Sequence, residues 1–241
     1  AAGCQYAILE MTSEGVKQYR HQWIYLDALL FLNITPEHIE SHGSFENYLS
    51  AKLKLRDLLE RSPKKDKVLV ANADDPHGKD FLSVSSARAL PYALSLGAPY
   101  STSPHGVVFT LGGVAISSPL PGLFTISNML AAAVFAKSRG IDTATIKRGL
   151  ERVKEIPGRL ERVEAGQPFS VVVDYAHTPD SLEKLYGAFG DARKICLLGN
   201  TGGGRDRWKR PEMGRIADTH CAKVILTNED PYDENPQAIL S

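Results

Sequence analysis

Cysteine, tryptophan and net charge are all scarce in this sequence of 241 residues. It has three cysteines and two tryptophans, and its 28 acidic residues balance its 28 lysines and arginines. Without net charge, no global field favours nucleic acid or an anionic membrane. No apolar run approaches the roughly 20 residues that a membrane helix needs. The start, AAGCQYAILE, lacks the basic region and cleavage pattern of a signal peptide.

Metal-binding cysteine pairs and the common glycine-rich nucleotide motifs are also missing. The three cysteines lie in apolar surroundings, so we expect Cys4, Cys196 and Cys221 to be small buried hydrophobic residues in a reducing compartment. No G-x-x-x-x-G-K-[ST] occurs, because Gly78-Lys79-Asp80 lacks both the loop and the hydroxyl. No G-x-G-x-x-G follows a strand, which argues against a dehydrogenase-like nucleotide module.

What the sequence does contain is an alternation of apolar runs and helical patterns, which predicts βαβ units and a mostly parallel sheet. The expected strands are 5–10, 27–33, 67–71, 107–111, 114–117, 169–174, 193–198 and 222–227. The expected helices are 44–61, 76–83, 86–95, 125–139, 142–153, 179–189 and 211–219. The Ser-, Pro- and Gly-rich segment 99–121 predicts an antiparallel excursion at the sheet edge. The chain length permits two domains, and Glu155–Gly158 is the expected hinge.

The segment DYAHTPDSL, residues 174–182, follows an apolar run and precedes a helical pattern. In open α/β sheets, ligands bind where a buried strand ends and turns into a helix. Asp174 would sit at that strand end and could accept hydrogen bonds from ribose hydroxyls. The alternative is that Asp174 and Thr178 only cap the helix that Pro179 opens.

Nine motifs in one order cover nearly the whole chain and together resemble the Mur ligases, most closely the MurE type. They are LEMTSEG (9–15), LNITPEHIESHG (32–43), SAKLKLRDLL (50–59), ANADDP (71–76), GLFTISNMLAA (122–132), PGRLERV (157–163), DYAHTPDSL (174–182), GNTGGGRDRWKRPEMG (199–214) and TNEDPYDENP (227–236). The resemblance implies an α/β fold with a P-loop-type central domain, residues 1–156, and a Rossmann-like C-terminal domain, residues 157–241. In the family, the phosphate loop lies upstream of the segment that opens this chain, and further sequence follows the segment that ends it. We therefore expect the isolated fragment to be inactive.

The resemblance also implies a magnesium site. Glu10 matches a glutamate that binds Mg²⁺, His38 matches a histidine that helps to bind a second Mg²⁺, and Lys52 matches a lysine whose carbamylation creates a carboxylate for the metal. Residue chemistry alone leaves other readings open. Glu10 could be a solvated carboxylate, His38 a structural histidine and Lys52 a solvent-facing lysine.

ATP is the second ligand that the resemblance implies. Asn128 matches an asparagine that contacts adenine, although Thr125 replaces a second asparagine of the motif. Asparagine has a low helix propensity, so its presence inside a helix favours a role in ligand recognition. Arg159 matches an arginine near the ATP phosphates. Lys209 belongs to the glycine-rich, basic loop 199–210, a type of loop that can wrap anions.

The residues expected at the substrates are Thr12, Ser13, His42, His177, Arg205, Asp230 and Tyr232. For Thr12 and Ser13 the alternative is a helix cap, and for ANADDP it is a turn that structure explains wholly. MurE types that use meso-diaminopimelate carry D-N-P-R, whose Arg binds the distal carboxylate. Here the match is Glu229-Asp230-Pro231-Tyr232, so its charge favours lysine or another cationic amino acid. Alternatively, these residues form only an acidic turn.

We therefore expect a monomeric, cytoplasmic, ATP- and Mg²⁺-dependent ligase for peptidoglycan precursors. It would add the third amino acid to UDP-N-acetylmuramoyl-L-Ala-D-Glu through an acyl phosphate. One alternative is a sister ligase of the folylpolyglutamate or cyanophycin synthetase type. From a different class, the chain could be a non-catalytic Rossmann nucleotide-binding module.

Overall fold

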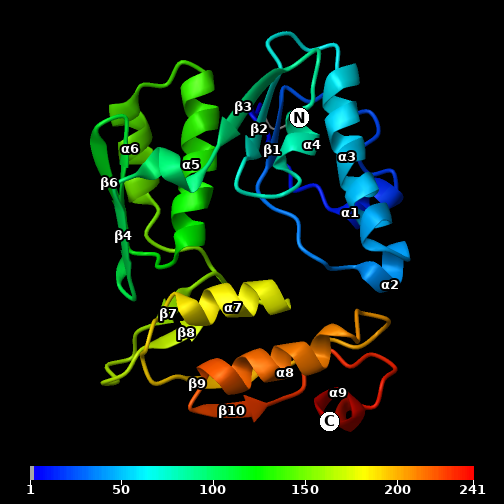
Figure 1. The fold of residues 1–241 in the computed structure, drawn as a ribbon, viewed down its shortest axis with the longest axis vertical. Helices are drawn as coiled ribbons and strands as arrows, with labels where there is room; N and C mark the ends of the chain where they lie inside the picture. The colour runs from blue at the N-terminus through cyan, green and yellow to red at the C-terminus, as the bar shows by residue number, and fades with distance from the viewer. Residues whose placement is uncertain (1–2) are drawn as a thin grey trace.

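The structure is a computed structural model that describes residues 3–241. Figure 1 shows an N-terminal part built on a parallel sheet with a helical and antiparallel layer beside it, and a C-terminal part below both. The N-terminal part comprises α1 (Ser13–Lys17), β1 (Ala28–Phe31), α2 (Ile39–His42), α3 (Phe45–Arg61), β2 (Val68–Asn72), α4 (Gly78–Leu82), β3 (Arg88–Tyr92), η1 (Leu94–Gly97), β4 (Tyr100–Ser103), β5 (Gly106–Leu111), β6 (Val114–Ser118), α5 (Leu123–Ser138) and α6 (Thr143–Arg152). The C-terminal part comprises β7 (Glu161–Val163), β8 (Val171–Val173), α7 (Pro179–Gly187), β9 (Ile195–Leu198), α8 (Lys209–His220), β10 (Lys223–Leu226) and α9 (Pro236–Leu240).

The parallel sheet β1-β2-β3 positions the first group of candidate residues. Its central strand β2 is the apolar run VLVAN, and Val68 to Ala71 are fully buried. Helix α3 packs beside it and begins where the Ser44 hydroxyl accepts a hydrogen bond from the Asn47 amide. A stripe at helical spacing faces inward, namely Tyr48, Ala51, Leu55 and Leu59. Leu49, Leu53 and Leu58 of the same helix are only partly buried.

The predicted antiparallel excursion is confirmed as a sheet of its own. Strands β4, β5 and β6 pair antiparallel in that order, and their apolar side packs on α5 and α6 (Figure 1). Phe109, Ile116, Ile126 and Leu130 are fully buried at this junction. This layer holds α5 in place and with it the segment that carries Asn128.

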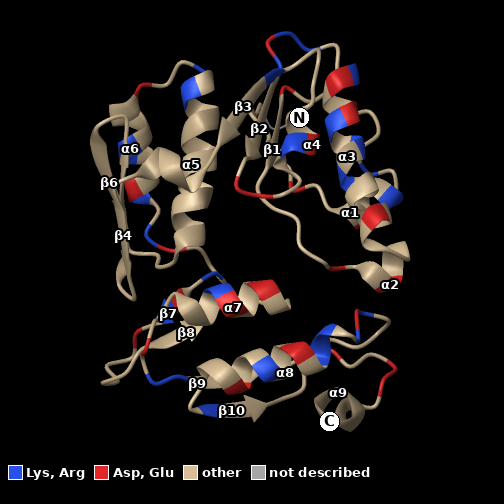
Figure 2. Cartoon of the chain, in the orientation of Figure 1, with Lys and Arg blue, Asp and Glu red and all other residues tan. Residues whose placement is uncertain are grey.

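In the C-terminal part, α7 and α8 cover one face of the parallel pair β9-β10. Strand β9 alternates as expected: Cys196 and Leu198 point into the core, whereas Ile195 and Leu197 are exposed. The two charge signs are interspersed along α3 and α8, in keeping with the balanced composition (Figure 2).

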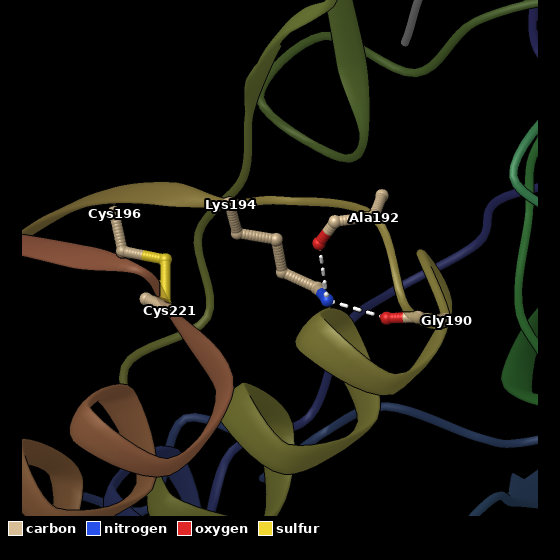
Figure 3. The surroundings of a disulfide bond; sticks show 5 residues. All are labelled: Gly190, Ala192, Lys194, Cys196 and Cys221. Carbon is tan, nitrogen blue, oxygen red and sulfur yellow. Dashed lines mark hydrogen bonds between the residues drawn. A yellow bond between two sulfur atoms is a disulfide. The ribbon is translucent and has the colours of Figure 1, made fainter.

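The prediction for the cysteines is wrong in two respects. Cys196 and Cys221 form a disulfide, shown in Figure 3, which joins β9 to the residue that ends α8. Both positions are buried, as expected, and parallel pairing of β9 with β10 brings them within bonding reach. Cys4 is exposed rather than buried.

Two predicted elements are also wrong. Residues 5–10 form no strand within the described part of the chain, and Tyr6 and Ile8 are exposed, so this apolar run has no neighbour to pair with. Residues 86–95, predicted as helical, instead form β3 and the start of η1. Pro91 explains the difference, because proline breaks a helix interior but is tolerated on an edge strand, and β3 is the edge of its sheet.

Several short elements, α1, α2, β4 and β7, carry too little periodicity to be predicted. Among residues 3–241, no helix combines the length and apolarity needed to cross a membrane.

Candidate active site

The carboxyl ends of β1, β2 and β3 meet at one edge of the sheet, where polar side chains tie their loops together. Asp75 accepts hydrogen bonds from the Ile34 amide at 3.0 Å and the His77 amide at 2.9 Å, and Asp74 accepts one from the Leu94 amide at 2.6 Å. Asn72 donates to the Leu32 carbonyl. The ANADDP motif therefore has a structural explanation: it fixes the loops that follow the strands.

Tyr48 of α3 brings together three of the predicted site residues. The His38 ring lies 5.8 Å from the Tyr48 ring, the His42 ring lies 5.5 Å from it, and Lys52 Nζ lies 6.0 Å from its centroid. Burial, together with the charge of Glu37, raises the pKa of Tyr48 to about 12. The phenol therefore stays neutral at physiological pH and forms one wall of the cluster.

Lys52 is half-buried rather than solvent-facing. Its Nζ lies 3.5 Å from the Met11 carbonyl. Burial lowers the pKa of Lys52 below its usual value, while the carboxylates of Glu37 and Glu10 act in the opposite direction. Glu10 itself lies in the exposed segment before α1, so its charge reaches Lys52 from outside the cluster.

The segment around α1 holds the predicted substrate residues Thr12, Ser13 and His42. The Thr12 hydroxyl accepts a hydrogen bond from the Gly15 amide at 2.9 Å, which confirms its alternative role as a helix cap. Ser13 Oγ and His42 Nε2 are buried and meet no hydrogen-bond partner among residues 3–241. His42 Nε2 lies 3.4 Å from Glu14 Oε1, yet burial lowers the pKa of His42. The lowered pKa favours the neutral form of the His42 imidazole, and Ser13 supplies a buried hydroxyl on α1.

Glu37 links this cluster to the C-terminal part. Its Oε1 accepts a hydrogen bond from His177 Nε2 at 2.9 Å and lies 3.8 Å from His38 Nε2. Burial opposes ionisation of Glu37, but His177, His38 and Lys209 outweigh it and the pKa is lowered. The hydrogen bond to Glu37 raises the pKa of His177 in turn. His177 and His38 thus approach the same carboxylate oxygen of Glu37 from the two parts of the molecule.

Lys209 and Asp206 complete this junction. Lys209 Nζ donates to the His177 carbonyl at 2.8 Å, and burial lowers its pKa against the charges of Glu37, Asp206 and Glu229. The Asp206 carboxylate accepts hydrogen bonds from the amides of Ile39 at 3.3 Å and Glu40 at 2.9 Å. The loop that the sequence marked as anion-binding therefore closes directly on the segment that follows His38.

A cavity of about 710 Å³ lies along the same junction. It is lined by Thr35, Pro36, Thr178, Pro179, Asp180, Trp208, Pro211, Glu212 and Arg215. Its charged groups are paired within their own helices, since Arg215 bonds Glu212 and Lys184 bonds Asp180. The rest of the lining is threonine, proline and tryptophan, and one of these residues, Pro36, precedes Glu37 in the chain.

Asp174, which follows β8, binds the backbone on both sides of that strand. Its carboxylate accepts hydrogen bonds from the amides of Leu160 and Ala176, each at 2.8 Å. Thr178 caps α7, with Ser181 completing a capping box, so the capping alternative holds for Thr178. Each carboxylate oxygen of Asp174 still has acceptor capacity for a second donor, which leaves ribose binding open.

The Arg159 guanidinium lies 4.9 Å from the exposed Tyr175 ring, beside Asp174.

Asn128 lies exposed on α5, where a ligand could reach it. Thr125, which replaces the other expected asparagine, is buried, and its hydroxyl donates to the Pro121 carbonyl at 2.7 Å. At this departure from the motif, the Thr125 side chain is therefore bonded to the backbone four residues earlier and turned away from solvent.

The remaining predicted substrate residues, Arg205, Asp230 and Tyr232, lie on two loops that pack together. The Gly202 amide donates to the Asp230 carbonyl at 2.8 Å, and a Cβ at Gly203 would lie 2.8 Å from the Tyr232 ring. The glycines are therefore needed for close loop packing. Arg205 is exposed, whereas Arg210 is bound by Glu234.

Among residues 3–241, no three His, Cys, Asp or Glu side chains are grouped so that they could hold a metal ion. The donors that do meet are the carboxylate of Glu37 and the imidazole of His38, with Lys52 on the same tyrosine and Glu10 within electrostatic reach. Carboxylate oxygens suit Mg²⁺, and a carbamate on Lys52 would add two more. The chemistry of this set fits the ion that the resemblance implies.

Sequence reasoning missed Glu37 and Glu40. Both are acidic residues beside His38, but their importance comes from partners about 140 and 167 positions away in the sequence. The only local indication of a role for Glu37 and Glu40 was that they lie in the same motif as His38.

Comparison with known proteins identifies the family. The Mur ligase middle domain matches residues 1–136, and the Mur ligase glutamate ligase domain matches residues 158–241. The chain therefore belongs to the Mur ligase family, which confirms the predicted family and fold class.

Three relatives illustrate the similarity. A UDP-N-acetylmuramoyl-L-alanyl-D-glutamate–2,6-diaminopimelate ligase of Gloeobacter violaceus is 39% identical over 252 residues, covering 99% of this chain and 50% of that protein. A UDP-N-acetylmuramyl-tripeptide synthetase of Roseiflexus sp. is 38% identical over 265 residues, covering 100% and 51%. A solved structure of a UDP-N-acetylmuramoyl-L-alanyl-D-glutamate–2,6-diaminopimelate ligase aligns with a TM-score of 0.62 at 28% identity, covering 95% and 49%. The chain thus spans about half the length of the curated relatives it matches.

Proposed function

We propose that this chain is part of an ATP-dependent ligase that adds an amino acid to UDP-N-acetylmuramoyl-L-alanyl-D-glutamate. The names of the relatives at 38–39% identity support the reaction class. The observation that carries the proposal is the junction at Glu37, where His38 and Lys52 of one part face His177 and Lys209 of the other. Such a junction can hold two substrates against each other when the parts close.

In this reaction the D-glutamate carboxylate takes the γ-phosphoryl group of ATP to give an acyl phosphate and ADP. The amine of the incoming amino acid then attacks the acyl carbon, loses a proton and displaces phosphate. Asn128, Arg159, Asp174 and Lys209 would hold ATP. Glu10, His38 and Lys52, the last as a carbamate, would hold Mg²⁺, and this ion would neutralise charge on the phosphoryl group.

The substrate side would use the groups near α1 and the two packed loops. Ser13 presents a buried hydroxyl, and His42 presents an imidazole whose lowered pKa favours the neutral form. His177, Arg205, Asp230 and Tyr232 would face the incoming amino acid from the C-terminal part, and Thr12 would support Ser13 by capping α1. We propose cytoplasmic action of a monomer on soluble nucleotide-linked substrates.

Phosphate release by the full-length protein tests the proposal. With ATP, Mg²⁺ and UDP-N-acetylmuramoyl-L-alanyl-D-glutamate, release should depend on an added amino acid and should match the amide product one to one. Omission of the amino acid is the matched control. Release with a folate and glutamate, but none with the muramoyl substrate, would instead identify a sister ligase and overturn the proposal.

A further inference from the structure

His38 occupies a backbone conformation that needs support. Its φ of 57° and ψ of 25° lie in the left-handed region, which is unfavourable for a residue that carries a Cβ. It stands at the N-cap of α2, and its own side chain makes no capping hydrogen bond within the described structure. Its carbonyl already accepts the first helical bond, from the His42 amide at 3.0 Å. Whatever fixes the first turn of α2 therefore fixes His38.

The missing cap comes from the other part of the molecule. Asp206 Oδ2 and Oδ1 accept hydrogen bonds from the amides of Ile39 and Glu40, the two residues that follow His38. An N-cap side chain normally satisfies such amides from the same segment. Here the acceptor lies 166 positions away from Glu40 along the chain and is only 5% exposed. A buried carboxylate without these two donors would be unfavourable, so the contact is specific.

A second tie runs in the opposite direction. The Arg207 amide donates to Glu40 Oε1 at 2.9 Å, so each segment binds the backbone of the other through an acidic side chain. On the other side of His38, Glu37 bonds His177 at 2.9 Å. The residues on both sides of His38, Glu37 before it and Glu40 after it, thus bond to the C-terminal part.

We propose that Asp206 is a positioning residue that fixes His38 only when the two parts are closed on each other. In the open molecule the first turn of α2 loses its cap, and the left-handed backbone of His38 loses its support. In the closed molecule the imidazole is held against Tyr48, at 5.8 Å between ring centres, and near Glu37. Closure and placement of His38 then become one event. This inference rests on the proposed function for the chemical role of His38.

A double-mutant cycle in the full-length enzyme tests the coupling. Asp206→Ala should lower kcat by up to about 10²-fold, the effect expected of a small misplacement at a reacting centre. If Asp206 acts through His38, the same substitution in a His38→Ala background should change kcat little further. Asp206→Asn keeps one acceptor oxygen and should lie between wild type and alanine. Asp218→Ala, an exposed acid on α8, is the matched control and should leave kcat unchanged.

Nuclear magnetic resonance of the histidine side chains measures the position of the His38 ring without requiring catalytic activity. In this 241-residue chain, the imidazole resonances of His38 should shift on Asp206→Ala, because the ring moves relative to Tyr48. His105, in an exposed turn, is the internal reference and should not shift. A thermal melt confirms that the variant is folded, and Asp206→Asn serves if the alanine variant is not.

Additive effects of Asp206→Ala and His38→Ala on kcat would overturn the inference, as would an unmoved His38 resonance in a folded variant. If the wild-type full-length protein shows no ligase activity, the proposed function fails. The resonance measurement still decides whether Asp206 positions His38.

Discussion

At the scale of single residues, Lys52 shows how surroundings change a side chain's chemistry. Only a neutral amine can attack CO₂ to form a carbamate, and burial shifts Lys52 toward that form by lowering its pKa. The other lysine of α3, Lys54, is exposed. The sequence places two lysines on this helix, and the structure shows that Lys52 is the one that is partly buried beside Tyr48.

The first prediction concerns that residue. Lys52→Ala in the full-length enzyme should abolish ligation, because it removes the group that would become a metal-binding carbamate, and high bicarbonate should not restore it. Lys54→Ala is the matched control and should retain activity. Turnover near the wild-type value in the Lys52 variant, measured by phosphate release, would rule out the role.

The second prediction concerns Glu60, at the end of α3. Burial acts against its ionisation, but hydrogen bonds from the amides and hydroxyls of Ser85 and Ser86 prevail and lower its pKa from 4.5 to about 2. A folded-state pKa below the unfolded value adds stability that is full above pH 4.5 and is lost as the pH falls toward 2. Glu60→Gln should therefore destabilise the chain at pH 7, and the difference from wild type should shrink below pH 4.5.

Denaturant unfolding at several pH values measures this difference for Glu60→Gln. Glu164→Gln, in an exposed turn, serves as the control and should unfold like the wild type throughout. A deficit for Glu60→Gln that stayed constant down to pH 2 would contradict a carboxylate origin.

At the scale of elements, periodicity predicted those with one clear face. The long helix α3, the buried strand β2 and the alternating strand β9 all follow their apolar patterns. The helix prediction for residues 86–95 was wrong because an apolar-rich stretch is compatible with both a helix and a strand. Pro91 favours an edge strand over a helix interior. The strand prediction for residues 5–10 was wrong because a strand needs a neighbouring strand to pair with, and a local sequence pattern does not show whether one is present.

The third prediction belongs to β9 and α8. The Cys196–Cys221 disulfide closes a loop with a sequence separation of 25, and cross-links of that span stabilise by about 3 kcal/mol. Reduction should therefore lower the free energy of unfolding by about that amount, measured by urea unfolding with and without a reductant. Cys4→Ser should leave the difference unchanged, since Cys4 is not paired.

Thiol counting provides an independent check of the same pairing. After unfolding without reductant, the oxidised chain should expose one reactive thiol, that of Cys4. Three reactive thiols in material purified without reductant would show that the pair does not form.

At the scale of the whole molecule, the sequence predicted many candidate site residues but not how they meet. The motifs that contain His38, Lys52, Asp174 and Lys209 could be recognised in the sequence because each follows a predicted strand or lies in a helical pattern. The contacts that join the two parts were not, because Glu37 with His177 and Glu40 with Asp206 are pairs far apart in the chain. Folding alone brings them together, and no local pattern encodes such a pairing.

The last prediction concerns which amino acid the full-length enzyme adds. The names of several relatives specify 2,6-diaminopimelate, yet the loop at Glu229-Asp230-Pro231-Tyr232 presents two exposed acids and an exposed tyrosine. Tyr232 packs on Gly203 and cannot form a bidentate ion pair with a distal carboxylate. The acids would repel that carboxylate and attract an ammonium group, so we expect L-lysine to be preferred over meso-diaminopimelate.

Competition between the two amino acids in the ligation assay measures this preference as a ratio of kcat/KM. Glu229→Gln with Asp230→Asn should reduce the preference for lysine, because it removes the local negative charge, while the control Asp233→Asn, at an exposed acid outside the four-residue loop, should not. A clear preference of the wild-type enzyme for meso-diaminopimelate would refute the charge argument. It would then follow that groups other than this loop recognise the distal carboxylate, with the exposed Arg205 on the facing loop as the first candidate to substitute.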